Sequence, residues 1–232
     1  MKKNYTTILF DADNTLLNFD KDEDNALRKV MKEYGVPVTE ENINTYIEIN
    51  VSLWKALERG EITKPELKRT RFARFFEKIG FVTDADTFEV NERYLYLLGD
   101  GGNTLEGALE LCRELQEKGF DLYIITNGVT DTQKRRLSRS GLLPFISEVF
   151  ISETLGYQKP RKEFLDIVLG KIPEKDTSKI LVVGDSLTSD IKGAMNAGLE
   201  SVWLNLKKAE LPQEYTPDYV IEDIRDFRGI VL

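Results

Sequence analysis

The chain has 232 residues, of which 41% are hydrophobic and 31% are charged, and its formal net charge is −8. This length suits one large domain or a core with a smaller appendage, and the negative charge argues against binding nucleic-acid polymers, which requires a basic surface. The sequence contains no histidine, which excludes Ser-His-Asp and Cys-His nucleophile pairs and His-ligated zinc.

The single cysteine, Cys112, excludes an intrachain disulfide and is expected to be a small buried hydrophobe in an amphipathic helix. No apolar run reaches the roughly 18–20 residues that a membrane span needs, and no apolar stretch of signal-peptide length follows Lys2 and Lys3. We therefore expect a cytoplasmic protein that does not associate with membranes.

The first predicted element is a buried strand over residues 5–10 that ends at Asp11. From about residue 20 to 99 the pattern is helical, with no strong strand signal. Four helices are expected there: about 22–34, Thr39 to Gly60, Thr63 to Gly80, and one that holds Phe88 to Leu98. Thr63 and Glu66 have the spacing of a capping box, with Pro65 in the first turn.

Strands and helices alternate after Gly102, which is typical of a parallel sheet covered on both faces. Strands are expected near residues 122–125, 149–151, 180–183, 201–204 and 219–221. Helices are expected near residues 105–118, 131–140, 161–170 and 189–197. The prediction is therefore an α/β fold: a Rossmann-like parallel-sheet core (residues 1–17 and 100–232) with an α-helical cap (residues 18–99) inserted after the first strand.

Polar residues follow four of these strands, where open parallel sheets bind their ligands. They are Asp11 and Asp13, Thr126 and Asn127, Lys159, and Asp185 and Asp190. A carboxylate-rich set without histidine favours a hard cation such as Mg²⁺. These residues together indicate one pocket.

The set suits attack on a phosphate monoester. Mg²⁺ held by Asp11 and Asp185, with Lys159, would neutralise the dianion, and the Thr126 hydroxyl would donate to the same oxygens. Asp11 could then form an aspartyl-phosphate. Asp13, crowded by other carboxylates and so protonated near neutral pH, would protonate the leaving group and later accept a proton from water.

Four segments resemble the motifs of the haloacid dehalogenase-like hydrolase superfamily, in order and at the expected strand ends: Asp11-Ala12-Asp13-Asn14-Thr15, Thr126-Asn127-Gly128, Lys159-Pro160, and Gly184-Asp185-Ser186-Leu187-Thr188-Ser189-Asp190. The resemblance covers essentially the whole chain, including the inserted cap. It implies that Asp11 is the nucleophile and Asp13 the acid/base. It also implies Mg²⁺ on Asp11, Asp185 and the Asp13 backbone carbonyl, with Asp190 supporting the metal indirectly or through water.

Longer stretches are similar to the bacterial pyrimidine 5′-nucleotidases: residues 11–20, residues 126–133 and Gly156-Tyr157-Gln158-Lys159-Pro160. This similarity implies a small phosphorylated metabolite as the partner, a nucleoside monophosphate. We expect a monomer or weak dimer. A sugar-phosphate phosphatase, a phosphomutase and a non-catalytic protein that binds a phosphorylated ligand stay open as alternatives. A dehalogenase has no use for a second aspartate at position 13.

Several residues also have a simpler structural interpretation. Asp190 could cap a helix, and Ser186 could either cap it or bind metal-site waters. The cap aromatics Tyr46, Trp54, Phe72, Phe75 and Phe76 are expected to pack a core rather than stack a nucleobase. The basic residues Lys64, Lys68, Arg69, Arg71, Arg74 and Lys78 are expected to form a solvated helix face.

Overall fold

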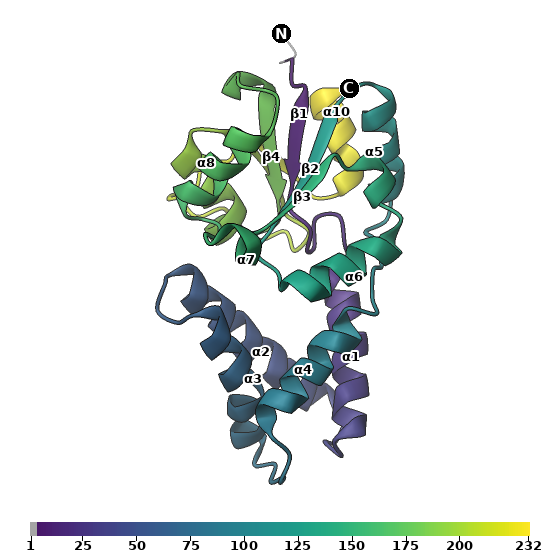
Figure 1. Cartoon of the computed structure of the whole chain (residues 1–232), viewed down its shortest axis with the longest axis vertical. Helices are drawn as coiled ribbons and strands as arrows, with labels where there is room; N and C mark the ends of the chain where they lie inside the picture. Colours follow the sequence, from purple (N-terminus) through teal and green to yellow (C-terminus); the bar gives the residue numbers. More distant parts are fainter. Residues whose placement is uncertain (1–3) are drawn as a thin grey trace. The chain divides into compact units, whose positions relative to one another are not determined.

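The computed structural model describes residues 4–232. The chain forms two compact units. One contains the chain up to Phe19 together with Gly102–Leu232, and the other is Asp20–Gly101 (Figure 1). Across residues 4–232, no helix combines the length and the apolar character that a bilayer crossing requires.

The first unit is built on a six-stranded sheet in the order β3-β2-β1-β4-β5-β6, in which all neighbouring strands are parallel. The strands are β1 (Thr7–Phe10), β2 (Asp121–Thr126), β3 (Glu148–Ile151), β4 (Ile180–Gly184), β5 (Glu200–Leu204) and β6 (Tyr219–Ile221). The predicted α/β class with a Rossmann-like parallel sheet is thus confirmed.

Helices cover both faces of this sheet (Figure 1). They are α5 (Ala108–Glu117), α6 (Thr130–Ser140), α7 (Ser152–Leu155), α8 (Lys162–Lys171), α9 (Lys192–Ala197) and α10 (Arg228–Val231). Alternate residues of a strand point to opposite faces. Ile8 and Phe10 therefore pack into the cluster that includes α5, whereas Leu9 packs into the cluster that includes α8. Burial on both faces explains why β1 has no exposed position.

The second unit consists of four helices: α1 (Phe19–Glu33, which begins at the boundary residue), α2 (Glu40–Glu58), α3 (Lys64–Ile79) and α4 (Thr87–Leu98). Thr39 is the N-cap of α2, and its hydroxyl accepts a hydrogen bond from the Asn42 backbone N–H. The capping box of Thr63 and Glu66 at α3 is present as predicted, with Gly80 in a left-handed conformation at the end of the helix.

The aromatic side chains of the helical unit pack its interior, as predicted for Tyr46, Phe72, Phe75 and Phe76, with Trp54 only partly buried. One prediction was wrong. Arg71 does not lie on a solvated face but is only 2% exposed. It lies on the same side of α3 as the buried Phe75, four residues further along the helix.

Hydrogen bonds to side-chain amides compensate for the loss of water around the buried guanidinium group of Arg71. It donates hydrogen bonds to Oδ1 of Asn91 and to Oδ1 of Asn50, the latter at 3.1 Å, and its centre lies 4.8 Å from the ring centroid of Tyr94. The other five basic residues of the predicted face are exposed or partly exposed.

Candidate active site

The carboxyl ends of the central strands lie at one edge of the sheet. Phe10 is in register with Ile124 of β2 and with Val183 of β4, so the residues that follow these strands are neighbours. The Asp11 backbone N–H also donates to the Val183 carbonyl at 2.8 Å. The strand order reverses at β1 and β4, and open α/β sheets bind ligands at such a switch point.

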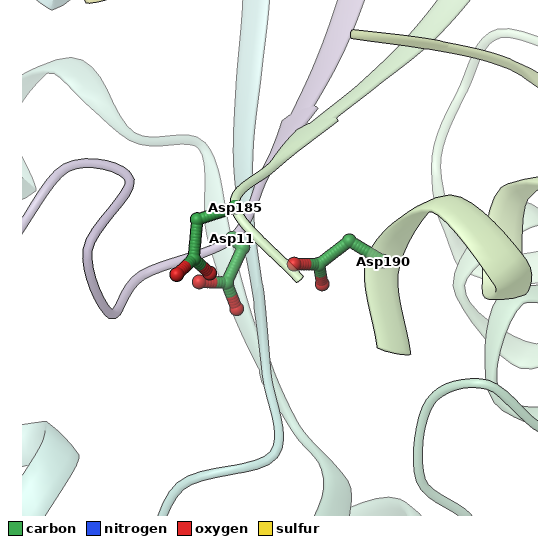
Figure 2. A group of neighbouring side chains, drawn as sticks. All are labelled: Asp11, Asp185 and Asp190. Atoms are coloured by element: carbon green, nitrogen blue, oxygen red, sulfur yellow. The ribbon is translucent and has the colours of Figure 1, made fainter. Parts of the chain in front are cut away.

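Three aspartates converge there (Figure 2). Asp11 follows β1, Asp185 follows β4, and Asp190 comes five residues later. One carboxylate oxygen from each lies within 4.8 Å of the others, which is a spacing that can hold a metal ion. Three carboxylates suit a hard divalent cation such as Mg²⁺.

The electrostatics of this cluster also fit a cation. Burial raises the pKa of Asp11 to about 7, with Asp190 and Asp13 adding to the effect and the Lys159 ammonium opposing it. Burial and the charges of Asp11 and Asp190 hold the pKa of Asp185 well above its usual range. A divalent cation would relieve this crowding, because it favours the charged form of each carboxylate.

Lys159 is buried within the same cluster. Its Nζ donates to Asp11 Oδ1 at 2.6 Å, to Asp190 Oδ1 at 2.7 Å and to the Ile125 carbonyl at 2.8 Å. Burial alone would lower the pKa of this ammonium, but the carboxylates of Asp11 and Asp190 outweigh it and hold the pKa above its usual value. The three ammonium protons thus all have protein acceptors, and Asp11 and Asp190 share the positive charge of Lys159.

Asn127 holds the backbone of Lys159 from both sides. Its Nδ2 donates to the Lys159 carbonyl at 2.8 Å, and its Oδ1 accepts from the Lys159 backbone N–H at 2.9 Å. The same Nδ2 donates to Ser189 Oγ at 3.3 Å. One amide therefore ties together the segments that follow β2, β3 and β4.

A tight loop after β1 places Asp13. The backbone N–H groups of Leu16 and Leu17 both donate to the Ala12 carbonyl, and Asn14 takes a left-handed conformation with φ of 53°. Asparagine tolerates this conformation better than most residues. The Asp13 side chain is partly exposed, so it can meet solvent or a ligand.

Two functional candidates were missed by the sequence reasoning, which expected other carboxylates around Asp13. Gln133 and Arg136 of α6 donate to its two carboxylate oxygens, Gln133 Nε2 at 2.7 Å. Both side chains are only 1% exposed. Their spacing of three residues on one helix face was the signal available in the sequence, because polar residues that share a buried face need partners.

The turn after β4 differs from the predicted helix over 189–197. Residues Leu187–Ile191 form a π-helical turn that leads into α9. Ser186 caps this turn by accepting from the Ser189 backbone N–H, and Asp190 Oδ2 accepts from the Ser186 backbone N–H at 3.1 Å. A Cβ on Gly184 would lie 2.3 Å from the Asp190 carboxyl carbon, so glycine leaves the space that Asp190 fills.

Trp203 supports the same turn from β5. Its indole Nε1 donates to the Asp185 carbonyl at 2.9 Å. This bond restrains the backbone of a candidate metal ligand, in the way that outer hydrogen bonds usually orient such ligands. The placement of all seven predicted residues is thus accounted for: Asp11, Asp185, Asp190 and Lys159 in the charged cluster, Asn127 behind it, and Asp13 and Thr126 joined through Gln133.

Comparison with known proteins agrees with this geometry. The family model described as haloacid dehalogenase-like hydrolase matches residues 5–198. Pyrimidine 5′-nucleotidase PynA of Streptococcus pneumoniae is 41% identical over 96% of this chain and 93% of its own length. Pyrimidine 5′-nucleotidase YjjG of Escherichia coli is 32% identical over 97% of this chain and 96% of its own length.

A solved structure shares the architecture throughout. The HAD-hydrolase YfnB of Bacillus subtilis, crystallised bound to magnesium, superimposes with a TM-score of 0.93 at 39% identity, covering 99% of both chains. The four motifs, the parallel sheet and these similarities together mean that the chain is a hydrolytic enzyme that belongs to the haloacid dehalogenase-like hydrolase family.

Proposed function

We propose that this enzyme is a Mg²⁺-dependent phosphatase that hydrolyses pyrimidine nucleoside 5′-monophosphates through a covalent intermediate on Asp11. The observation that carries the chemistry is the buried charge cluster, in which Asp11 shares the Lys159 ammonium with Asp190 and lies beside the Asp185 carboxylate. The substrate class is supported by the similarity to PynA and YjjG, which extends over nearly the whole chain.

The first half-reaction transfers the phosphoryl group to the protein. An Asp11 carboxylate oxygen attacks phosphorus, a new P–O bond forms, and the bond to the nucleoside 5′-oxygen breaks. Its electron pair leaves with the nucleoside oxygen, which takes a proton from Asp13. The Thr126 hydroxyl donates to a phosphoryl oxygen, and Lys159 offsets the negative charge near Asp11.

The second half-reaction restores the enzyme. Asp13 accepts a proton from water, the water oxygen attacks phosphorus, and the bond to Asp11 breaks to release inorganic phosphate. Mg²⁺, held by Asp11 and Asp185 with the Asp13 carbonyl and supported by Asp190, would supply positive charge against the phosphoryl oxygens in both halves.

A substrate panel tests the proposal. Phosphate release would be measured with Mg²⁺ on UMP, dUMP and dTMP, on purine nucleotides, on hexose and triose phosphates, and on an aryl phosphate. Asp11→Asn is the variant, and Asp166→Asn, an exposed aspartate of α8, is the matched control. We expect a preference for pyrimidine nucleotides that disappears in Asp11→Asn and persists in the control.

Other outcomes distinguish the alternatives. Faster hydrolysis of sugar phosphates would retain the mechanism and replace the substrate class. Interconversion of hexose phosphates faster than phosphate release would indicate a mutase. Wild-type protein that releases no phosphate from any ester would contradict the proposal and favour a non-catalytic binding role.

A further inference from the structure

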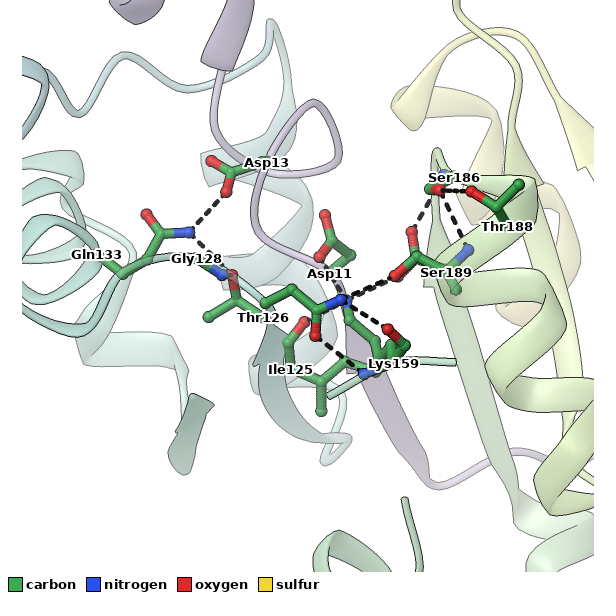
Figure 3. A network of polar contacts seen from close by, with 12 residues as sticks. Asp11, Asp13, Ile125, Thr126, Gly128, Gln133, Lys159, Ser186, Thr188 and Ser189 are labelled. Carbon is green, nitrogen blue, oxygen red and sulfur yellow. Dashed lines mark hydrogen bonds and ion pairs between the residues drawn. The ribbon is translucent and has the colours of Figure 1, made fainter. Parts of the chain in front are cut away.

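Gln133 occupies a junction between two groups that the proposed reaction uses. Its Nε2 donates to Asp13 Oδ2 at 2.7 Å and to Thr126 Oγ1 at 2.9 Å (Figure 3). Its Oε1 accepts from Arg136 Nη1 at 3.0 Å. An amide nitrogen carries two protons, and both are used. The orientation of the amide follows from its neighbours, because a flipped amide would place oxygen against the Asp13 carboxylate and nitrogen against the Arg136 guanidinium.

These bonds determine what the Thr126 hydroxyl can do. Thr126 Oγ1 accepts from Gln133 and also from the Gly128 backbone N–H at 3.0 Å. A hydroxyl has two acceptor lone pairs and one proton. With both lone pairs occupied, Thr126 can act only as a donor. In the proposed reaction, that proton would be donated to a phosphoryl oxygen.

The same bonds restrain Asp13. One of its carboxylate oxygens accepts from Gln133 and the other accepts from Arg136, whose guanidinium lies 5.4 Å from the ring centroid of Phe19. Two anchored oxygens fix the side-chain rotamer. Each oxygen keeps a further lone pair, so the carboxyl group can still carry the proton that it must deliver.

Gly128 provides the space for this junction. A Cβ at position 128 would lie 2.5 Å from both Cγ and Nε2 of Gln133. Any larger residue would therefore displace the Gln133 amide. The need to leave room for the Gln133 side chain thus explains the glycine in the Thr126-Asn127-Gly128 segment, independently of the geometry of the turn.

We propose that Gln133 is the positioning residue of this site: it orients the acid/base Asp13 and commits the Thr126 hydroxyl to donation, so that both meet the same phosphoryl group. This inference rests on the proposed phosphatase function. It assigns Gln133 no direct contact with substrate and no proton transfer.

The test uses Gln133→Met, which has nearly the same length and no hydrogen-bonding amide, and Lys134→Met, an exposed substitution on the same helix, as control. Both are compared with wild type on the best nucleotide, whose leaving group needs a proton, and on para-nitrophenyl phosphate, whose leaving group does not. For Gln133→Met we expect kcat on the nucleotide to fall about tenfold to hundredfold, with a smaller rise in KM.

The first turnover gives a readout that a merely structural role would not produce. With the aryl ester, we expect nitrophenol release in the first turnover of Gln133→Met to stay within about threefold of wild type, because the Thr126 hydroxyl keeps its proton and the bond from the Gly128 backbone N–H. The later steady-state rate falls, because water activation by Asp13 is impaired, so a burst appears. A general distortion of the site would slow the first turnover as well.

A double-mutant cycle tests whether Gln133 acts mainly through Asp13. In an Asp13→Ala background, Gln133→Met should change kcat on the aryl ester by less than about threefold, because Asp13 is gone and only the bond to the Thr126 hydroxyl remains to be lost. Gly128→Ala should reproduce the pattern of Gln133→Met without altering Gln133 itself, which covers the case in which Gln133→Met folds poorly.

Equal losses in both backgrounds, or unchanged kcat on the nucleotide, would overturn the inference. If wild type hydrolyses other alkyl phosphates but no nucleotide, the substrate class fails and the test proceeds with the best alkyl ester. A wild-type enzyme inert toward every ester would overturn both the inference and the proposed function.

Discussion

Replacing Glu23 with glutamine should remove a pH dependence that one buried carboxylate gives to the stability of the helical unit. Glu23 of α1 is 5% exposed. Its Oε1 accepts from Asn50 Nδ2 at 2.7 Å and from the Tyr94 hydroxyl at 3.2 Å. Asn50 in turn accepts from Arg71, so a neutral amide lies between the two opposite charges.

The size of this effect on the free energy of unfolding follows from the pKa of Glu23. Burial raises the pKa of Glu23 from 4.5 to about 7, although Arg71 and the two hydrogen bonds oppose the change. The folded chain therefore holds this proton more tightly than the unfolded chain. The free energy of unfolding must then fall as pH rises from 4.5 through 7. The difference between the two pKa values corresponds to a loss on the order of 3 kcal/mol.

Urea unfolding, followed by fluorescence to which Trp54 of the helical unit contributes, measures this loss. Glutamine imitates the protonated carboxyl group. We expect Glu23→Gln and wild type to agree within about 1 kcal/mol at about pH 5, and the variant to be more stable by about 2–3 kcal/mol at about pH 8. Glu48→Gln, an exposed substitution on α2, is the control.

Taking the difference between variant and wild type cancels the other titrating groups, including Asp11 and Asp185. A difference that stays constant between about pH 5 and pH 8 would refute the reasoning. So would a variant that is less stable than wild type at the higher pH.

Three further substitutions test the site. Asp185→Asn removes one of the three converging carboxylates, and the Mg²⁺ concentration for half-maximal phosphate release should rise at least about a hundredfold. Trp203→Phe removes the bond to the Asp185 carbonyl while keeping an aromatic ring in β5, and the half-maximal Mg²⁺ concentration should rise up to about tenfold with kcat at saturating Mg²⁺ retained. Asn127→Ala removes both bonds to the Lys159 backbone, and it should lower kcat and reduce the free energy of unfolding by about 1–2 kcal/mol, measured in urea.

A specific result would contradict each of these three predictions. An unchanged Mg²⁺ titration in Asp185→Asn would place the metal elsewhere. A loss of kcat in Trp203→Phe that saturating Mg²⁺ does not restore would mean that the indole acts on more than the metal ligand. Wild-type kcat in Asn127→Ala would show that Lys159 is held adequately without the amide.

The charged cluster could be anticipated from sequence because each member directly follows a buried strand or a short connection. Runs such as Ile180-Leu181-Val182-Val183 identify a central parallel strand, and parallel strands place their carboxyl ends at one edge. The meeting of Asp11 with Asp185 and Lys159 thus follows from pattern and topology alone, although the residues are far apart in the chain.

The partners of Asp13 could not be anticipated in the same way. Gln133 and Asp13 are 120 positions apart, and their contact depends on how α6 packs beside the loop after β1. Arg71 was mistaken for a surface residue for a related reason, since only tertiary packing brings Asn50 and Asn91 to its guanidinium. Hydrophobic periodicity identifies the buried face of a helix. A charged residue on that face must have a partner, but the sequence does not show which residue that partner is.

The conformation of the turn that contains Asp190 also could not be predicted from the sequence. The helix signal over 189–197 was correct in type, but the first turn is π-helical, with Asp190 Oδ2 bonded to the Ser186 backbone N–H. Such a wide turn depends on the Asp190 side chain filling the space beside Gly184. Local propensity does not contain that information.

Trapping the covalent intermediate tests the central claim most directly. Asp13→Asn protein would be mixed with radiolabelled para-nitrophenyl phosphate and Mg²⁺, quenched in acid within the first turnover, digested and mapped. We expect one phosphoryl group on the peptide that contains Asp11, removed by hydroxylamine and missing when Asp11→Asn is added. Nitrophenol release without label on that peptide, or label on another residue, would contradict Asp11 as the nucleophile.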